Sequence, residues 1–138
     1  MKAIVDSCVW SLALRRRNTA QFSDVEQHAL DQLRDLIRLR SAALIGAIRQ
    51  EVLSGIRDDA QFLKTRDLLE PFRDQEVIPA DYVEAARLFN LCRKKGMECG
   101  PIDMLICAVA IRLNFTVLTN DRGLLRCMAL LRRDGLAL

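Results

Sequence analysis

The sequence predicts an α/β fold, namely a single three-layer α/β/α domain with a short, mainly parallel central sheet of four or five strands. Short apolar runs alternate along the chain with segments whose apolar residues recur every three or four positions. Such alternation is typical of a parallel sheet with helices on both faces. The length of 138 residues and the hydrophobic fraction of 51% suit one domain with its own core, so residues 1–138 are expected to form one unit.

The first half of the chain is predicted to hold two strands and four helices. The predicted elements are a strand over 2–5, helices over 8–16 and 23–40, a strand over 42–45, and helices over 48–56 and 60–72. The helix over 23–40 shows the clearest apolar face, with charged residues between its members. That face is expected to consist of Val25, Ala29, Leu30, Leu33, Leu36 and Ile37.

The second half is predicted to begin with a strand and to alternate thereafter. The predicted elements are a strand over 76–78, a helix from Pro79 to about Lys94, a helix starting at Gly100 and Pro101, a strand over 115–119, a helix over 122–131 and a candidate fifth strand over 135–138. Proline suits the first turn of a helix because its missing N–H would have no partner there. Residues 104–111 are apolar all round, so periodicity alone does not separate helix from strand, and the preceding proline favours helix.

Cysteine and histidine content argues against two large classes of site. The cysteines form no CxxC pair and the chain has a single histidine, His28, so a zinc site is not expected. We expect each cysteine to be a buried, reduced thiol that packs as a small hydrophobic residue. These cysteines are Cys8, Cys92, Cys99, Cys107 and Cys127. Histidine-based nucleophilic catalysis also lacks the residues it needs, so carboxylates must carry any chemistry.

Charge and hydropathy indicate a cytoplasmic protein with a phosphate-rich or acidic partner. The net charge is +3, and 17 of the 21 basic residues are arginines, whose planar side chain binds phosphate oxygens in pairs. Neither GxxxxGK[ST] nor GxGxxG occurs, which removes the basis for kinase or ATPase chemistry. The chain meets Asp6 after three apolar residues, and its longest apolar run is 104–111, so neither a signal peptide nor a membrane-spanning helix is expected.

Four acidic residues stand where strands are predicted to pass into helices or in the opening turns of helices. They are Asp6, Glu51, Asp103 and Asp121. The carboxyl ends of parallel strands lie at one edge of a sheet, so these acids are expected to converge there. Carboxylates gathered in this way raise each other's pKa values unless they share a cation. The pattern therefore predicts a divalent-metal site, and Mg²⁺ is a hard ion that prefers such oxygen ligands.

Each acid also has an ordinary structural explanation. Asp6 or Ser7 can cap the first helix, and Asp103 can stabilise the start of its helix through the helix dipole. Asp121, or the asparagine before it, can cap the last helix or form an Asx turn. Glu51 can be a solvent-facing helix residue. The joint placement of all four at one predicted edge favours the metal site over four independent caps.

The four acids lie in four short segments with a recognisable order and separation. These are IVDSCVW at residues 4–10, QEVLSG at residues 50–55, PIDMLICA at residues 101–108 and LTNDRGL at residues 118–124. Together the segments resemble the PIN domain family and, within it, the VapC-type ribonuclease toxins of bacterial toxin–antitoxin modules. The resemblance spans nearly the whole chain. It thins at Gly123 and Leu124, where many relatives carry a second acid and an aromatic residue.

The resemblance implies an acidic pocket that holds Mg²⁺ or Mn²⁺. The catalytic residues that it implies are Asp6, Glu51, Asp103 and Asp121. Asp6, Asp103 and Asp121 are expected to be metal ligands, and Glu51 to orient water or to help bind a second ion. All four match the family pattern despite the departure that follows the last of them.

Polar and basic residues are expected to support this pocket. Ser7 and Thr119 match polar positions beside it in the family. Arg15, Arg49 and Arg122 are candidates for binding the RNA backbone from the rim, which would make affinity depend on salt.

The resemblance further implies a Mg²⁺- or Mn²⁺-dependent endoribonuclease that is the toxin of a type II toxin–antitoxin module. Such an enzyme would hydrolyse phosphodiester bonds of RNA with metal-activated water. It would be held in check by a cognate antitoxin protein and would form a homodimer. Two alternatives stay open, namely a PIN-fold nuclease that matures RNA or acts on DNA, and a non-catalytic RNA- or protein-binding module.

Overall fold

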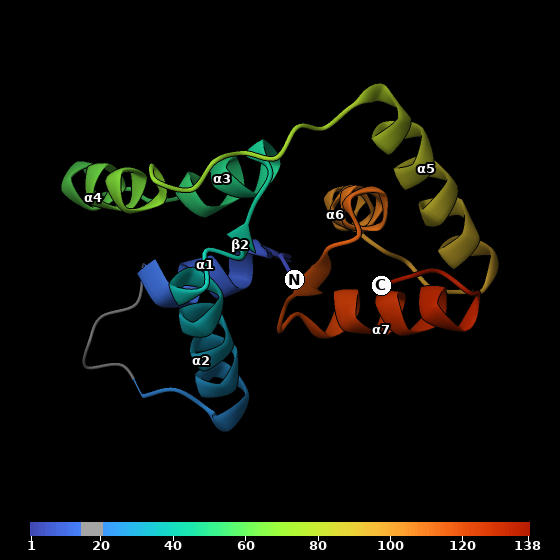
Figure 1. The fold of residues 1–138 in the computed structure, drawn as a ribbon, viewed down its shortest axis with the longest axis horizontal. Helices are drawn as coiled ribbons and strands as arrows, with labels where there is room; N and C mark the ends of the chain where they lie inside the picture. The colour runs from blue at the N-terminus through green and yellow to red at the C-terminus, as the bar shows by residue number, and fades with distance from the viewer. Residues whose placement is uncertain (15–20) are drawn as a thin grey trace.

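The computed structural model describes residues 1–14 and 21–138. Helices dominate the described chain, and the strands are short (Figure 1). In order, the elements are β1 (Ala3–Val5), α1 (Ser7–Leu14), α2 (Asp24–Arg38), β2 (Ala42–Ala43), α3 (Gly46–Leu53), α4 (Asp59–Leu69), α5 (Pro79–Lys94), α6 (Pro101–Leu113), β3 (Thr116–Leu118) and α7 (Arg122–Arg133). Among these residues no helix is both long and apolar enough to cross a membrane.

The strands found in the described chain form one parallel, three-stranded sheet in the order β2-β1-β3. Ala3 of β1 lies opposite Ala42 of β2 and Thr116 of β3. The central strand β1 is buried along its whole length, as its sequence Ala-Ile-Val requires. Figure 1 shows α1 to α4 on one side of the sheet and α5 to α7 on the other. This arrangement confirms the prediction of a parallel sheet flanked by helices.

The prediction of four or five strands is wrong for the described residues, because neither 76–78 nor 135–138 forms a strand. Pairing here stops at a single parallel bridge between Leu44 and Asp74, in which Gln75 N–H donates to the Leu44 carbonyl at 2.9 Å, and Arg112 donates to the Glu76 carbonyl at 2.8 Å. Residues 135–138 instead fold back on α7. There, Leu136 N–H donates to the Leu131 carbonyl at 3.1 Å, after a turn at Gly135 with a φ of +90°.

Helix α2 buries a narrower face than its apolar pattern predicts. It begins after Ser23, whose hydroxyl accepts from Glu26 N–H in a capping box. Ala29 and Leu33 are buried against α1, whereas Val25 is 66% exposed and Ile37 is 41% exposed. The helix lies at the margin of the molecule, so only one strip of it meets the core (Figure 1).

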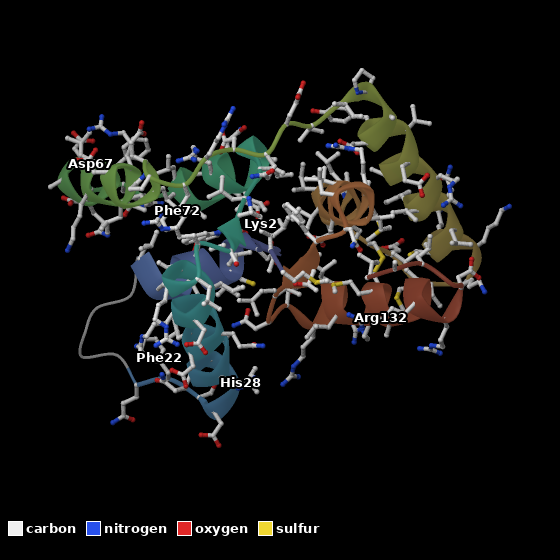
Figure 2. All side chains as sticks on the ribbon, in the orientation of Figure 1. Lys2, Phe22, His28, Asp67, Phe72 and Arg132 are labelled. Atoms are coloured by element: carbon white, nitrogen blue, oxygen red, sulfur yellow. A yellow bond between two sulfur atoms is a disulfide. The ribbon has the colours of Figure 1, made fainter. Side chains whose placement is uncertain are left out.

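The core continues on both sides of the sheet. On the side of α1, Trp10 packs edge to face on Phe72 with ring centroids 4.8 Å apart, and Figure 2 shows Phe72 lying toward α1. On the other side, the apolar run over 104–111 is helical, as the preceding proline indicates, and its residues 104–110 are buried. α5 packs along α6 there.

The expectation that all five cysteines are reduced is wrong for two of them. Cys99 and Cys127 form a disulfide across 28 positions of sequence. The cause is tertiary, because the segment before α6 meets α7 in the core, where both sulfurs are buried. Cys92 and Cys107 are buried free thiols as expected, and Cys8 is a partly exposed free thiol.

Candidate metal centre

Asp6 follows the central strand and is the most enclosed of the four acids. Its backbone N–H continues the pairing of β1 with β3 by donating to the Leu118 carbonyl at 2.9 Å. Its side chain is only 5% exposed, and both carboxylate oxygens accept hydrogen bonds. Ser7 N–H donates to Oδ1 at 2.8 Å, and the Thr119 hydroxyl donates to Oδ2 at 2.8 Å. These contacts fix the carboxylate at the carboxyl end of β1.

Glu51 reaches the same edge from α3, the helix that follows β2. Its carboxylate oxygen Oε1 accepts a hydrogen bond from the Ser7 hydroxyl, a contact that joins positions 44 residues apart. Ser7 therefore bonds to two of the acids, through its N–H to Asp6 and through its hydroxyl to Glu51. The side chain of Glu51 is otherwise open to solvent, as suits a group that meets water or substrate.

Asp103 lies in the first turn of α6, which begins after Gly100 and Pro101. Its pKa is raised to about 6, first by burial and then by the negative charges of Asp6, Asp121 and Glu51. The other three acids therefore lie close enough to act on Asp103 electrostatically. A Cβ at position 100 would come within 3.1 Å of Asp103 Oδ2, so glycine there leaves room for the carboxylate.

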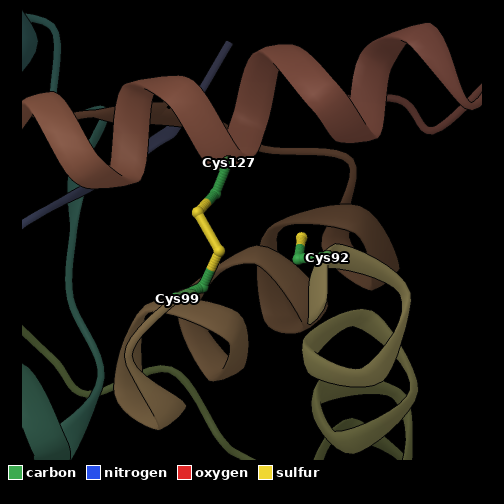
Figure 3. Close-up of side chains that lie close together, drawn as sticks. All are labelled: Cys92, Cys99 and Cys127. Carbon is green, nitrogen blue, oxygen red and sulfur yellow. A yellow bond between two sulfur atoms is a disulfide. The ribbon is translucent and has the colours of Figure 1, made fainter. Parts of the chain in front are cut away.

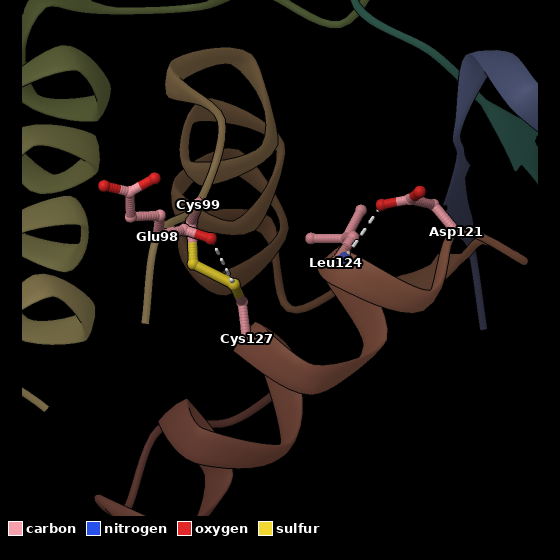
Figure 4. The surroundings of a disulfide bond; sticks show 5 residues. All are labelled: Glu98, Cys99, Asp121, Leu124 and Cys127. Atoms are coloured by element: carbon pink, nitrogen blue, oxygen red, sulfur yellow. Dashed lines mark hydrogen bonds between the residues drawn. A yellow bond between two sulfur atoms is a disulfide. The ribbon is translucent and has the colours of Figure 1, made fainter. Parts of the chain in front are cut away.

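Asp121 caps α7 by accepting Leu124 N–H at Oδ2, at 2.9 Å (Figure 4). Its own N–H donates to the Thr119 hydroxyl at 3.1 Å. The one hydroxyl of Thr119 thus donates to Asp6 and accepts from Asp121. Gly123 follows closely, and a Cβ there would lie 3.3 Å from Asp121 Oδ2. A side chain at position 123 would therefore need this carboxylate to shift by a few tenths of an ångström.

The structure brings the four predicted acids together at the carboxyl edge of the sheet, with Ser7 and Thr119 hydrogen-bonded among them. The capping interpretation of Asp121 is also correct, and it leaves the other carboxylate oxygen for a ligand. The catalytic and metal-binding roles of these residues stay predictions. The structure supports these roles only by placing the four acids at one edge of the sheet.

The three arginines predicted to bind RNA differ in their surroundings. Arg122 is exposed at the first position of α7, next to Asp121. Arg49 instead pairs with Asp74 at 2.9 Å and donates to the carbonyls of Leu69 and Phe72, so its guanidinium ties α3 to the end of α4. Arg15 lies outside the described residues. Of the two described arginines, only the exposed Arg122 remains a candidate RNA contact.

Sequence reasoning missed Cys8 as a neighbour of the site. Its Sγ donates to Asp6 Oδ2 at 3.4 Å and lies 3.5 Å from the Thr119 hydroxyl oxygen. Burial, followed by the charge of Asp6, raises the pKa of this thiol. The signal available in the sequence was its position two residues after Asp6, at the start of α1.

The donor set fits a hard divalent cation. Carboxylate oxygens are the ligands that Mg²⁺ and Mn²⁺ prefer. Burial raises the pKa of Asp103 most, and the charges of the other three acids add to the shift, so a shared cation would offset the second part of it. Asp6, Asp103 and Asp121 are the residues predicted to hold it, and in the described, metal-free chain no three of the four acids have carboxylate oxygens all within 4.8 Å of one another.

Comparison with known families agrees with this geometry. Residues 3–128 match the family model described as PIN domain. No curated protein matches the chain. PIN domains are in general nucleases that bind RNA and use divalent metal ions. Because the match covers most of the sequence and the acids meet at the carboxyl edge of a parallel sheet, this chain belongs to the PIN domain family.

Proposed function

We propose that this protein is a Mg²⁺- or Mn²⁺-dependent endoribonuclease. The observation that carries the proposal is the convergence of four carboxylates from four separate segments, close enough that three of them help to raise the pKa of Asp103 to about 6. A structural cap does not need such a partner set, whereas a metal-dependent hydrolase does. A non-catalytic module gains nothing from placing four mutually repelling carboxylates together.

The residues divide the work between holding the ion and aligning the reactants. Asp6, Asp103 and Asp121 hold the ion in this proposal. The hydroxyl of Thr119 fixes Asp6 relative to Asp121, because it bonds to both residues. When bound, a divalent ion supplies Lewis-acid chemistry, in that it acidifies water and neutralises charge on phosphate oxygens. Glu51, supported by Ser7, is exposed and positions a water at the site.

Substrate binding is expected to rest on phosphate contacts beside the acids. Arg122 stands next to Asp121 on an exposed helix start, and its guanidinium suits a phosphate of the RNA backbone. Affinity should therefore fall as salt concentration rises.

We also propose that the enzyme is the toxin of a type II toxin–antitoxin module, cytoplasmic and homodimeric, with an antitoxin protein as its partner. The support for this finer role is the resemblance of the four segments around Asp6, Glu51, Asp103 and Asp121 to VapC-type toxins. An RNA-maturation nuclease of the same family is the alternative class.

The first experiment measures cleavage of structured RNA with Mg²⁺, with Mn²⁺ and with chelator. We expect chelator to abolish cleavage, and Asp6→Asn and Asp103→Asn to lower it on the order of 100-fold or more. Asp59→Asn is the matched control, because it makes the same change in the first turn of α4, away from the site. Wild-type protein that cuts no RNA with either ion would refute the nuclease proposal.

The second experiment separates toxin from maturation enzyme. Brief induced expression of a toxin should arrest growth, and mapping of RNA ends should reveal a small set of cleavage sites. Asp103→Asn should do neither. A nuclease that is active in vitro but leaves growth unchanged would favour the maturation role instead.

A further inference from the structure

Three sulfurs from three different segments meet outside the acidic site. Cys92 lies on α5, Cys99 lies just before α6 and Cys127 lies on α7, and their Sγ atoms are all within 4.8 Å of one another (Figure 3). All three residues are buried. Cys99 and Cys127 are joined as a disulfide, and Cys92 remains a thiol beside it.

The disulfide joins the two segments that carry half of the acidic set. Cys99 precedes Asp103 by four residues. Cys127 lies on α7, six residues after Asp121, the N-cap of that helix (Figure 4). The segment between Cys99 and Asp103 is short and closely packed, because Met104 N–H donates to the Gly100 carbonyl at 3.1 Å and a proline opens the helix. Each cysteine is therefore only about one or two helical turns from a site carboxylate. A change in the position of its sulfur would move that carboxylate.

We infer that Cys99 and Cys127 are a site of reversible oxidation whose disulfide fixes Asp103 relative to Asp121, so that divalent-ion binding at the acidic edge depends on redox state. This inference rests on the proposed metal site and adds a means of controlling it. Supports of this kind tune a metal site without touching the ion, since they hold its ligands in place.

The oxidation balances with a low-molecular-weight disulfide, such as glutathione disulfide, as co-reactant. The Cys99 thiolate attacks that disulfide and releases one small thiolate, and the Cys127 thiolate then attacks the Cys99 sulfur and expels the second. Two protein thiols become one disulfide, and two electrons with two protons pass to two small thiols. Cys99 acts first because it is 8% exposed, whereas Cys127 is 1% exposed.

Cys92 is the thiol that could replace Cys99 or Cys127 in the disulfide. It is fully buried, and burial raises the pKa of its thiol, which keeps it protonated and slow to attack the neighbouring disulfide. Three sulfurs at this spacing are also compatible with a soft metal ion held by thiolates. Cys99 and Cys127 are bonded to each other in this structure, and peptide mapping with metal analysis separates the two possibilities.

The test uses the full-length chain in a glutathione redox series, with Mn²⁺ alone as the probe. Intact mass should fall by two hydrogens on oxidation, and peptide mapping should recover a Cys99–Cys127 bridge. Calorimetric titration should show Mn²⁺ binding about tenfold weaker after reduction. The melting temperature of the metal-free protein should fall by about 10 °C on reduction, since the bridge closes a loop of 28 positions.

Two variants separate the bridge from the packing around it. Cys99→Ser removes the bridge and should bind Mn²⁺ like the reduced wild type in either buffer. Cys92→Ala removes a buried thiol of the same cluster while the bridge remains, so it should keep the difference between the oxidised and reduced states. Should Cys99→Ser fail to fold, the reduced wild type provides the same comparison.

Three outcomes would overturn the inference. One is equal Mn²⁺ affinity in the two redox states, and another is a map that pairs Cys92 with either of the other cysteines. The third is a stoichiometric zinc or copper ion in freshly purified protein that has no bridge. RNA cleavage is scored separately: redox-dependent Mn²⁺ binding without cleavage defeats the proposed function alone, and cleavage with redox-independent Mn²⁺ binding defeats this inference alone.

Discussion

Thr119 shows how one hydroxyl can set the geometry of two acids. Its oxygen donates to Asp6 at 2.8 Å and accepts from Asp121 N–H at 3.1 Å, and the residue is only 8% exposed. The bond to Asp6 needs the residue after β3 to stand beside the residue after β1, which the parallel pairing of those strands provides, whereas the bond from Asp121 is local, between residues two positions apart. Local chemistry at the site is therefore a direct consequence of strand register.

Asp103 should make the stability of the metal-free protein depend on pH. Its pKa is about 6 in the folded chain against an ordinary value of 3.8, so the folded state binds this proton more tightly than the unfolded chain does. Stability should consequently fall as pH rises from about 4 to about 6, and this contribution should be flat outside that window. Urea unfolding at a series of pH values, with chelator present, measures the effect.

Asp103→Asn provides the comparison, because asparagine resembles the protonated carboxyl in shape and cannot ionise. The difference in unfolding free energy between this variant and the wild type should grow across the same pH window. Asp59→Asn is the control, since it makes the same chemical change in the first turn of a different helix, α4. Parallel curves for the wild type and Asp103→Asn would contradict the prediction.

At the scale of elements, an ion pair positions α5 against α6. Arg112, near the end of α6, donates to both oxygens of Asp81 at 2.7 and 2.9 Å and to the Glu76 carbonyl. Asp81 is 2% exposed and also accepts Ile78 N–H at the start of α5. The guanidinium accordingly holds the pKa of Asp81 below its ordinary value.

Asp81→Asn should destabilise the fold by about 2 kcal/mol, because it removes the charge from a buried carboxylate that accepts from Arg112 and from Ile78 N–H. Glu84→Gln is the matched control on the same helix. It breaks an exposed pair with Arg87 and should cost less than about 1 kcal/mol. Urea unfolding of both variants checks the ranking, and equal losses would show that the Asp81 pair is no stronger than a surface pair.

Elements with local signals could be predicted from the sequence, and those set by distant partners could not. Ser23 with Glu26, and Pro101 after Gly100, mark helix starts through interactions within a few residues. The segment 76–78 has the sequence of a strand, yet pairing ends before it, at one bridge between Leu44 and Asp74, and the Glu76 carbonyl accepts from Arg112, 36 residues away. Segment 135–138 was misassigned for a similar reason, since it packs back on α7.

For the molecule as a whole, the topology explains why the acidic site was more predictable than the sulfur cluster. Parallel strands place every strand end at one edge, so the order of Asp6 and Asp121 along the sequence was enough to bring them together. No comparable rule brings Cys99 to Cys127. Their meeting depends on how α7 packs beside the start of α6, which cysteine spacing does not encode.

The same topology predicts that the whole molecule should be stabilised by a divalent ion. Asp6, Asp103 and Asp121 are spread over 115 positions and come together only in the folded chain, so an ion that needs all three binds the native state and not the unfolded one. At a hundred times its dissociation constant, Mn²⁺ should add about 2.7 kcal/mol to the unfolding free energy. For a domain of this size, that corresponds to roughly 8 °C in melting temperature, measured by calorimetry against protein in chelator.

Asp6→Asn and Asp103→Asn should lose this Mn²⁺-dependent shift, while Asp59→Asn should keep it. The two site variants each remove one carboxylate from a set whose charges act on one another, so the remaining acids hold the ion less tightly. A full shift in both site variants would mean that Mn²⁺ stabilises the protein from elsewhere on its surface. In that event the carboxyl edge of the sheet would be an array of helix caps, and the metal-dependent function would have to be abandoned.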